Sequence, residues 1–192
     1  ALVGGHDEMT PAFFEILRKG KIFRQGAEVC GETAVAVVLG SSADTQTNVP
    51  NCTPCCRLSS MSILYRPSRE RLKAVLASML QQSGRTVADI DAVLSGISGN
   101  PEPDARYVEE LKAMVGEKPI LHYKHLFGQS FTASAIGFYV AVQCLKTGFV
   151  PENLFLERSG AIAETGRVLH PKGLLLYNRG DGNACSLILL EK

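Results

Sequence analysis

Four polar side chains lie close together where an apolar segment gives way to small residues: His122, Lys124, His125 and Gln129. Imidazole accepts or donates a proton near neutral pH, the lysine ammonium supplies positive charge, and a carboxamide donates a neutral hydrogen bond. Most turns between a strand and a helix carry no chemistry, so a purely structural role is the alternative. The residue types and their spacing nevertheless make this segment the first candidate for a functional site.

The residues around this segment predict a strand, a turn and a helix. Residues 119–121 are apolar and predict a buried strand, and Gly128 predicts the turn. Small residues follow, and they predict a helix that runs to about residue 146 and ends at Gly148. A helix N-terminus has unpaired N–H groups and partial positive charge, and α/β proteins build sites at such places.

After Arg57 the sequence alternates between the patterns of strands and helices. The predicted elements are strands at 57–65, 90–95, 119–121, 173–177 and 184–190 and helices at 68–83, 105–115 and 132–146. This alternation implies right-handed crossovers and a mostly parallel sheet covered by helices. Gly- and Asn-rich residues 178–183 predict a hairpin that adds an antiparallel edge. The predicted fold class is therefore α/β with strand–helix alternation on a mostly parallel sheet and an antiparallel terminal hairpin.

The N-terminal part follows a different pattern. A threonine–proline pair predicts the start of a short helix over 12–18. Residues 31–39 are almost continuously apolar and predict a strand covered on both faces, with the Glu32 carboxylate hydrogen bonding to backbone at its entrance. Residues 40–56 are rich in Ser, Thr, Asn and Pro and predict a linker.

Composition and charge exclude several classes of protein. With 192 residues of which 45% are hydrophobic, the chain can fill a core, so disorder is not expected. The formal charge of +1 and the lack of a basic run interleaved with aromatics argue against nucleic acid as a partner. No apolar run approaches the roughly 18 residues of a membrane helix. No export signal is visible, so a cytoplasmic protein with reduced thiols and no membrane partner is expected.

A cluster of cysteines offers a second candidate site. Cys52, Cys55 and Cys56 lie in the linker and could hold zinc or a redox pair, with His6 or His170 as a distant further ligand. Zinc needs about four ligands, and no second cysteine pair lies nearby, so a loop without a metal is the favoured interpretation. The remaining cysteines lie in apolar segments and are expected to be buried: Cys30, Cys144 and Cys185.

Five segments resemble motifs of one known family, in the same order. Residues 1–5 look like a strand and Gly-Gly turn that follow a nucleophile helix, and 31–34 look like Gly-Glu-Gly-Ala. Residues 90–93 precede the position of a His-Gly-Thr-x-Thr-Pro motif, 124–129 look like Lys-Ser-x-x-Gly-His, and 180–183 look like the end of Gly-Phe-Gly-Gly-Thr-Asn. Together they resemble the C-terminal part of the β-ketoacyl synthases of the thiolase superfamily.

The resemblance implies a thiolase-like fold that is truncated at the N-terminus. Residues 1–50 would be the tail of the N-terminal half plus a linker, and 51–192 the C-terminal half. It implies a decarboxylative Claisen condensation in which a cysteine carries the acyl group and two histidines help to decarboxylate malonyl-carrier protein and stabilise the thioester oxyanion. The nucleophile would lie before Ala1, so this segment alone is not expected to be catalytic. No cofactor and no metal is implied.

The resemblance also assigns site residues, and the sequence departs from the pattern at two of them. Lys124 matches the motif lysine and Glu32 the family glutamate, but the first motif histidine falls on about Gly96 and the second on Gln129. Gln129 can donate one neutral hydrogen bond to a thioester oxygen, whereas it cannot gain a proton as histidine can. Residues expected by resemblance to contact substrate are Asn183, Gly182, Phe127 and Ser98.

Two histidines lie near the position of the missing second motif histidine, and His125 is counted with the catalytic candidates. Alternation along an extended strand predicts that His122 and His125 lie on opposite faces from Tyr123 and Lys124 respectively. Whether either histidine takes over the missing role is left open by the sequence.

Three functions remain open. The first is the C-terminal part of a β-ketoacyl synthase-like protein of fatty acid or polyketide-type synthesis, with acyl-carrier protein, the missing N-terminal half and a homo- or heterodimeric subunit as partners. The second is a non-catalytic partner of the chain-length-factor type, which the missing histidines favour. The third is a metal-binding module at the cysteine cluster. A basic group could touch an acidic carrier protein, with a solvated surface as the alternative: Arg18, Lys19, Lys21 and Arg24.

Overall fold

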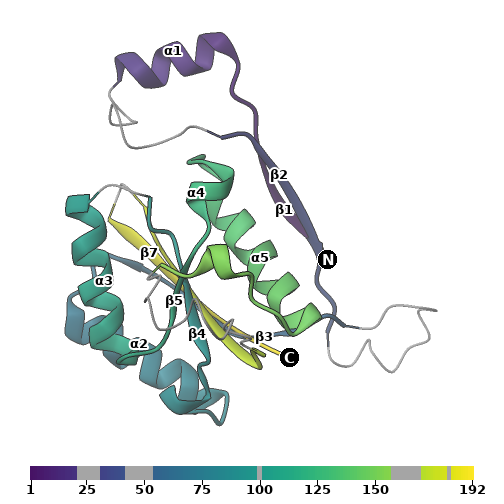
Figure 1. Ribbon diagram of the computed structural model, residues 1–192, viewed down its shortest axis with the longest axis vertical. Coiled ribbons are helices and arrows are strands. Elements are labelled where there is room, and N and C mark those ends of the chain that lie inside the picture. Colours follow the sequence, from purple (N-terminus) through teal and green to yellow (C-terminus); the bar gives the residue numbers. More distant parts are fainter. Residues whose placement is uncertain (21–30, 42–53, 99–100, 157–169, 181–182) are drawn as a thin grey trace.

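A five-stranded sheet organises most of the chain in the computed structural model (Figure 1). The structure describes residues 1–20, 31–41, 54–98, 101–156, 170–180 and 183–192. The strands of this sheet are β3 (Arg57–Tyr65), β4 (Ala92–Ser95), β5 (Ile120–His122), β6 (Gly173–Arg179) and β7 (Ala184–Glu191). They lie side by side in the order β3-β7-β6-β4-β5.

Strand β7 is antiparallel to the rest of the sheet. β4 pairs in parallel with β5 and β6, whereas β7 runs antiparallel to both of its neighbours, β6 and β3. The predicted α/β class and terminal hairpin are confirmed. The prediction that the hairpin adds an antiparallel edge is wrong, because β7 lies inside the sheet and β3 forms that edge. Periodicity places a strand in a sheet but does not say which distant strand becomes its neighbour.

Helices cover the two faces of the sheet. α2 (Arg69–Gln82) and α3 (Pro101–Val115) lie on one face, and α5 (Ala133–Thr147) lies on the other (Figure 1). Along β6, Leu175 packs with the first group of helices and Leu176 with α5, because successive strand residues point to opposite faces. Strands that are apolar throughout therefore fill both cores, and each buried leucine contributes about 1.5–3 kcal/mol relative to an exposed one.

Local capping sets the ends of these helices. Ser68 Oγ accepts a hydrogen bond from the Arg71 backbone N–H at 3.2 Å at the start of α2, as its position before the helix predicts. α5 ends at Gly148 in the left-handed region, with φ +69°. The prediction that the α3 helix begins at Ala105 is wrong, since it begins at Pro101. Prolines are tolerated in the first turn, where backbone N–H groups have no intrahelical partner.

The N-terminal residues form a separate antiparallel ribbon that extends away from the sheet (Figure 1). It consists of β1 (Leu2–Asp7) and β2 (Thr33–Val38), with α1 (Pro11–Lys19) between them in sequence, at the position of the predicted short helix. The prediction that the second strand is covered on both faces is wrong, because burial alternates along it and Val38 is 77% exposed. Asp7 joins the ribbon to the start of α5, where its carboxylate accepts hydrogen bonds from Thr132 N at 2.7 Å and Thr132 Oγ1 at 3.1 Å.

Candidate functional site

The C-terminal ends of β4, β5 and β6 meet at one edge of the sheet. The register pairs Ser95 with His122 on one side and with Tyr177 on the other, so the next residue of each strand also lies together: Gly96, Tyr123 and Asn178. We call these three residues and the 124–130 segment after Tyr123 the carboxyl edge. In open α/β sheets, ligands bind outside the carboxyl ends of the parallel strands.

Two histidines stack on one another at the carboxyl edge. β5 ends at His122, and a single helical turn, α4 (Lys124–Phe127), follows after Tyr123. The rings of His122 and His125 lie 3.9 Å apart between centroids at an interplanar angle of 21°. The prediction that His122 and His125 alternate as on one extended strand is therefore wrong, because α4 replaces the expected end of the strand. Burial, followed by the charge of His125, lowers the pKa of His122 to about 4, with Asp104 acting in the opposite direction, so its ring is neutral at pH 7.

The Gln129 side chain lies just before the start of α5. Gly128, with φ +79°, turns the chain after α4 as the sequence predicts. The Gln129 Oε1 atom is buried and has no hydrogen-bond partner among the described residues. Its backbone carbonyl accepts a hydrogen bond from Gly31 N at 2.9 Å, which brings the 31–33 segment beside the candidate site.

Gly96 occupies the position where the resemblance expects the first motif histidine, and the surroundings leave no room for a side chain. A Cβ atom there would lie 2.4 Å from Asn178 Oδ1 and 3.3 Å from the Tyr107 hydroxyl oxygen. The Gly96 N–H points to Tyr177 O at 3.1 Å and to the Tyr107 hydroxyl at 3.2 Å. A histidine at this position would require Asn178 and Tyr107 to move.

Sequence reasoning missed Asn178. Its side chain is 9% exposed, and Oδ1 accepts a hydrogen bond from the Tyr123 hydroxyl at 2.9 Å. Burial raises the pKa of Tyr123, so the phenol keeps its proton and acts as the donor. Asn178 Nδ2 is buried without a partner among the described residues. The signal that could have found it is its place as the first polar residue after the apolar run 174–177.

A buried ionic group lies behind the carboxyl edge, between α3 and β6. Glu110 is 6% exposed, and its carboxylate accepts hydrogen bonds from Arg179 Nη1 at 2.6 and 2.7 Å and from the Tyr177 hydroxyl at 3.0 Å. Charged pairs of this geometry are strong hydrogen bonds and hold both partners in place. The pair fixes the end of β6 next to the hairpin that leads into β7.

The other predicted catalytic residues differ in their burial and in their contacts. Lys124 begins α4 and is half-buried at the carboxyl edge, whereas His125 is exposed. The Glu32 carboxylate accepts a hydrogen bond from the Met9 backbone N–H at 2.8 Å, which confirms the predicted backbone contact. Lys124 and Gln129 therefore belong to the same segment of the carboxyl edge, and Glu32 has a backbone partner on the N-terminal part of the chain.

The residues expected to contact substrate are spread over several loops. Phe127 is 43% exposed at the end of α4. The Ser98 backbone N–H donates to Asp104 at 3.1 Å. Asn183, with φ +61°, shapes the hairpin, since its N–H donates to Gly180 O at 3.1 Å and its carbonyl accepts from Arg66 N at 2.9 Å. Gly182 lies outside the described residues.

The cysteine cluster is described only in part. Cys52 lies outside the described residues, and within them no group of three or more His, Cys, Asp and Glu side chains could hold a metal ion. His170 Nδ1 lies 2.6 Å from Gly148 O. Cys144 and Cys185 are buried as predicted, whereas Cys30 lies outside the described part. Of the basic group, Arg18 and Lys19 pair with Glu15 at 2.6 and 3.6 Å, and Lys21 and Arg24 are not described.

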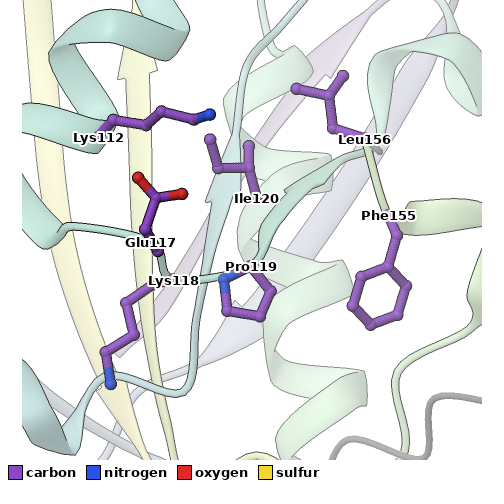
Figure 2. A pocket seen from close by; sticks show the side chains of 7 residues that line it. All are labelled: Lys112, Glu117, Lys118, Pro119, Ile120, Phe155 and Leu156. Atoms are coloured by element: carbon purple, nitrogen blue, oxygen red, sulfur yellow. The ribbon is translucent and has the colours of Figure 1, made fainter. Parts of the chain in front are cut away.

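A hollow of about 200 Å³ lies at the opposite edge of the sheet, where β5 begins (Figure 2). Its lining combines apolar and charged side chains: Lys112, Glu117, Lys118, Pro119, Ile120, Phe155 and Leu156. It is therefore separate from the carboxyl edge. Among the described helices, none has the length and apolarity that crossing a membrane requires.

Comparison with known proteins identifies the fold. No family model and no curated protein matches the chain. The chain matches many solved structures, and three of them illustrate the likeness. The ishigamide ketosynthase/chain length factor shares 13% identity at a TM-score of 0.74, with 100% of this chain and 53% of that chain covered. A type II PKS acyl-carrier protein in complex with its ketosynthase bound to the hexaketide shares 13% at 0.75 (99% and 55% covered), and the ketosynthase from module 6 of the bacillaene synthase from Bacillus subtilis 168 shares 18% at 0.76 (100% and 42% covered). The chain spans about half the length of these structures. Their likeness confirms the predicted thiolase-like fold.

Proposed function

We propose that this chain, which has the thiolase-like fold of the ketosynthases, is the C-terminal half of a protein that condenses acyl groups carried on acyl-carrier protein. The reaction is a decarboxylative Claisen condensation in fatty acid or polyketide-type synthesis, with the nucleophile supplied from outside this chain. The coverage of the two chains supports this. The match extends over 99–100% of this chain but over only 41–55% of the ketosynthase chains. Residues 1–50, which hold the separate β1–β2 ribbon, would belong to the preceding half, and residues 51–192 form the C-terminal half.

The observation that carries the proposal is the placement of the 124–129 segment. It lies directly after a parallel strand and before α5, and it presents Lys124 and the partly buried carboxamide of Gln129. The carboxamide nitrogen of Gln129 can donate to a thioester oxygen, where negative charge develops during acyl transfer. Because an amide does not titrate, its hydrogen bond is available at any pH at which the protein is folded.

A condensation assay tests this function on the full-length parent protein, with acyl- and malonyl-carrier protein as substrates. We expect Gln129→Ala to lower kcat/KM by about 10²–10³-fold, the effect of removing one oxyanion donor. Gln81→Ala, at an exposed position of α2, is the matched control and should leave the rate unchanged. Absence of turnover in the unsubstituted parent with every carrier protein and acyl chain offered would contradict an active condensing enzyme.

A second candidate is a non-catalytic partner of the chain-length-factor type. The occlusion of position 96 by Asn178 and Tyr107 favours it, because a condensing enzyme of the expected pattern places a histidine there. The residue at the nucleophile position of the parent gene discriminates between the two. A cysteine at the start of a helix supports the enzyme, and any other residue there supports the partner, which should then co-purify with an active ketosynthase as a heterodimer.

The proposed function implies which partners the protein has and in which compartment it acts. The preceding half of the fold, acyl-carrier protein and a second subunit are the expected partners, in the cytoplasm. Acyl-carrier protein is supported by the complex of a type II PKS acyl-carrier protein with its ketosynthase, whose fold this chain shares. Exposed Arg18 and Lys19 could meet an acidic carrier protein, although both already pair with Glu15.

A further inference from the structure

The side-chain amide nitrogen of Asn178 needs a hydrogen-bond acceptor that the described residues do not supply. The residue is 9% exposed, and Nδ2 is buried with no partner in the described part of the chain. Large majorities of buried polar atoms in proteins are paired, and leaving one donor unpaired costs about 1–3 kcal/mol. Ligands of open α/β sheets bind at this edge, so a donor held here is suited to donate a hydrogen bond to a ligand oxygen.

The orientation of this carboxamide is fixed from the other side. Oδ1 accepts the proton of the Tyr123 hydroxyl at 2.9 Å. The Tyr123 ring is fully buried against α5, where a Cβ added to Gly137 would lie 2.7 Å from it. Rotation of the amide by half a turn would leave the Tyr123 hydroxyl proton facing the donor Nδ2. Asn178 therefore directs Nδ2 away from Tyr123.

The same carboxamide fills the space beside Gly96. Its Oδ1 would lie 2.4 Å from any Cβ at that position, so position 96 cannot contribute a side chain to the carboxyl edge while Asn178 is in place. The Gly96 N–H is already directed at Tyr177 O and the Tyr107 hydroxyl. Among the described residues at these three strand ends, Asn178 on β6 carries a buried side-chain donor that lacks a partner.

We propose that Asn178 Nδ2 donates a hydrogen bond to the carbonyl oxygen of the bound acyl thioester. This rests on the proposed function. When a carbanion attacks the thioester carbon, the C=O π electrons move onto the oxygen, and the N–H···O bond strengthens while the proton stays on the amide nitrogen. No proton is transferred, so Asn178 acts as a neutral donor in the place from which a side chain at position 96 is excluded.

Infrared spectroscopy of a bound probe tests the contact. The probe is the acetyl thioester of N-acetylcysteamine with a ¹³C-labelled carbonyl, added to the full-length parent protein. A hydrogen bond to the carbonyl oxygen lowers its stretching frequency, so we expect a band below that of the free probe. Asn178→Ala should return the band towards the frequency of the free probe. It should also lower kcat by about 10²-fold, a larger change than its effect on KM.

Two further variants make the readout specific. Asn178→Asp keeps the shape and the acceptor for Tyr123 but replaces Nδ2 with an oxygen, so it should also lose the frequency shift. Asn153→Ala, at an exposed position in the 3₁₀ turn Glu152–Leu154, is the matched control and should keep it. Should neither Asn178 variant fold, the same contact is checked in the unsubstituted protein, where the ¹⁵N side-chain amide resonance of Asn178 must move when the probe binds.

The outcomes separate the contact from the function. A shifted band that is lost in the Asn178 variants and kept in Asn153→Ala supports the contact. A shifted band that persists in folded Asn178→Ala or Asn178→Asp, or a ¹⁵N resonance that does not move on binding, overturns the contact and leaves the proposed function standing. If the unsubstituted parent binds no thioester and gives no bound band, the proposed function fails, and the contact fails with it.

Discussion

At position 96, the lack of a side chain is a packing requirement, because a Cβ would overlap Asn178 Oδ1. We predict that Gly96→Ala destabilises the protein by about 1–3 kcal/mol, the usual effect of overpacking a core. Chemical denaturation measures the free energy of unfolding. Gly40→Ala is the matched control, since nothing lies within 4 Å of a Cβ there, and it should change stability by no more than about 0.5 kcal/mol.

A double variant shows whether Asn178 is the cause. Gly96→Ala combined with Asn178→Ala removes the overlapping oxygen. The free energy of unfolding that the double variant loses should therefore be smaller than the sum of the losses in the two single variants. Strict additivity would mean that Tyr107 or the backbone, rather than Asn178, opposes the new methyl group.

His122 gives the stability of the protein a dependence on pH. Its pKa is lowered from 6.5 to about 4, chiefly by burial. Between these two values the unfolded chain binds more protons than the folded one, so stability falls as the pH falls through this window and is unaffected by this group above about pH 7. We predict that His122→Gln loses less thermal stability than the unsubstituted protein between pH 6.5 and 4. Melting curves with parallel pH dependence in both proteins would contradict this.

At the scale of elements, one ionic group ties α3 to the end of β6. Removing Glu110 leaves Arg179 without its partner beside a buried phenol, and breaking a buried pair in this way costs about 3–5 kcal/mol. Since the Arg179 side chain is 21% exposed, we expect Glu110→Ala to destabilise the protein by about 3 kcal/mol in chemical denaturation. Glu109→Ala is the neighbouring control, because its 3.7 Å contact with Arg69 is exposed, and it should cost less than about 1 kcal/mol.

The elements that could be predicted from the sequence are those whose ends depend on local chemistry. Thr10 and Ser68 cap the starts of α1 and α2, and the left-handed Gly148 ends α5. Each acts within one turn of the helix, and these three helix ends lie where the sequence predicts. The inner position of β7 and the exposed face of β2 could not be predicted, because each depends on which distant strand supplies the neighbour.

The candidate site was predictable to the same extent. The place of the 124–129 segment between a strand and a helix was predictable because its polar residues follow an apolar strand and precede small helical residues. The His122–His125 stack was missed because α4 breaks the period-two alternation one residue after β5 ends. Asn178 was missed because its importance comes from contacts with Tyr123 and Gly96, which lie on other strands and far away in sequence.

At the scale of the whole molecule, two separate strand elements expose large apolar side chains. Large side chains are exposed along the edge strand β3 and the β1–β2 ribbon: Leu2, Val3, Val38, Met61, Ile63 and Tyr65. Exposed apolar side chains and a strand at the edge of a sheet both favour association with another protein surface. In the proposed function, the preceding half of the fold is the expected cover.

We predict that the 192-residue chain alone associates with itself in solution. Met61→Lys together with Ile63→Lys, which are 56% and 70% exposed on β3, should lower the association measured by sedimentation velocity without lowering the melting temperature. Ala77→Lys together with Gln81→Lys adds the same charge at exposed positions of α2 and is the control. Equal loss of association in both double variants would assign the effect to net charge rather than to β3.

The inner position of β7 also has a consequence for how the protein is made. On the ribosome, β3 emerges first of the five strands of the sheet and β7 last, and yet β7 is the strand that joins β3 to β6. The register pairs Arg57 with Glu191 across almost the whole C-terminal part of the chain. The nascent chain therefore holds β3 without a neighbour in this sheet throughout most of its translation, and such long-range pairing is slow to form. Completion of the sheet waits for translation of β7, and until then the exposed edge of β3 is open to whatever chaperone or partner reaches it first.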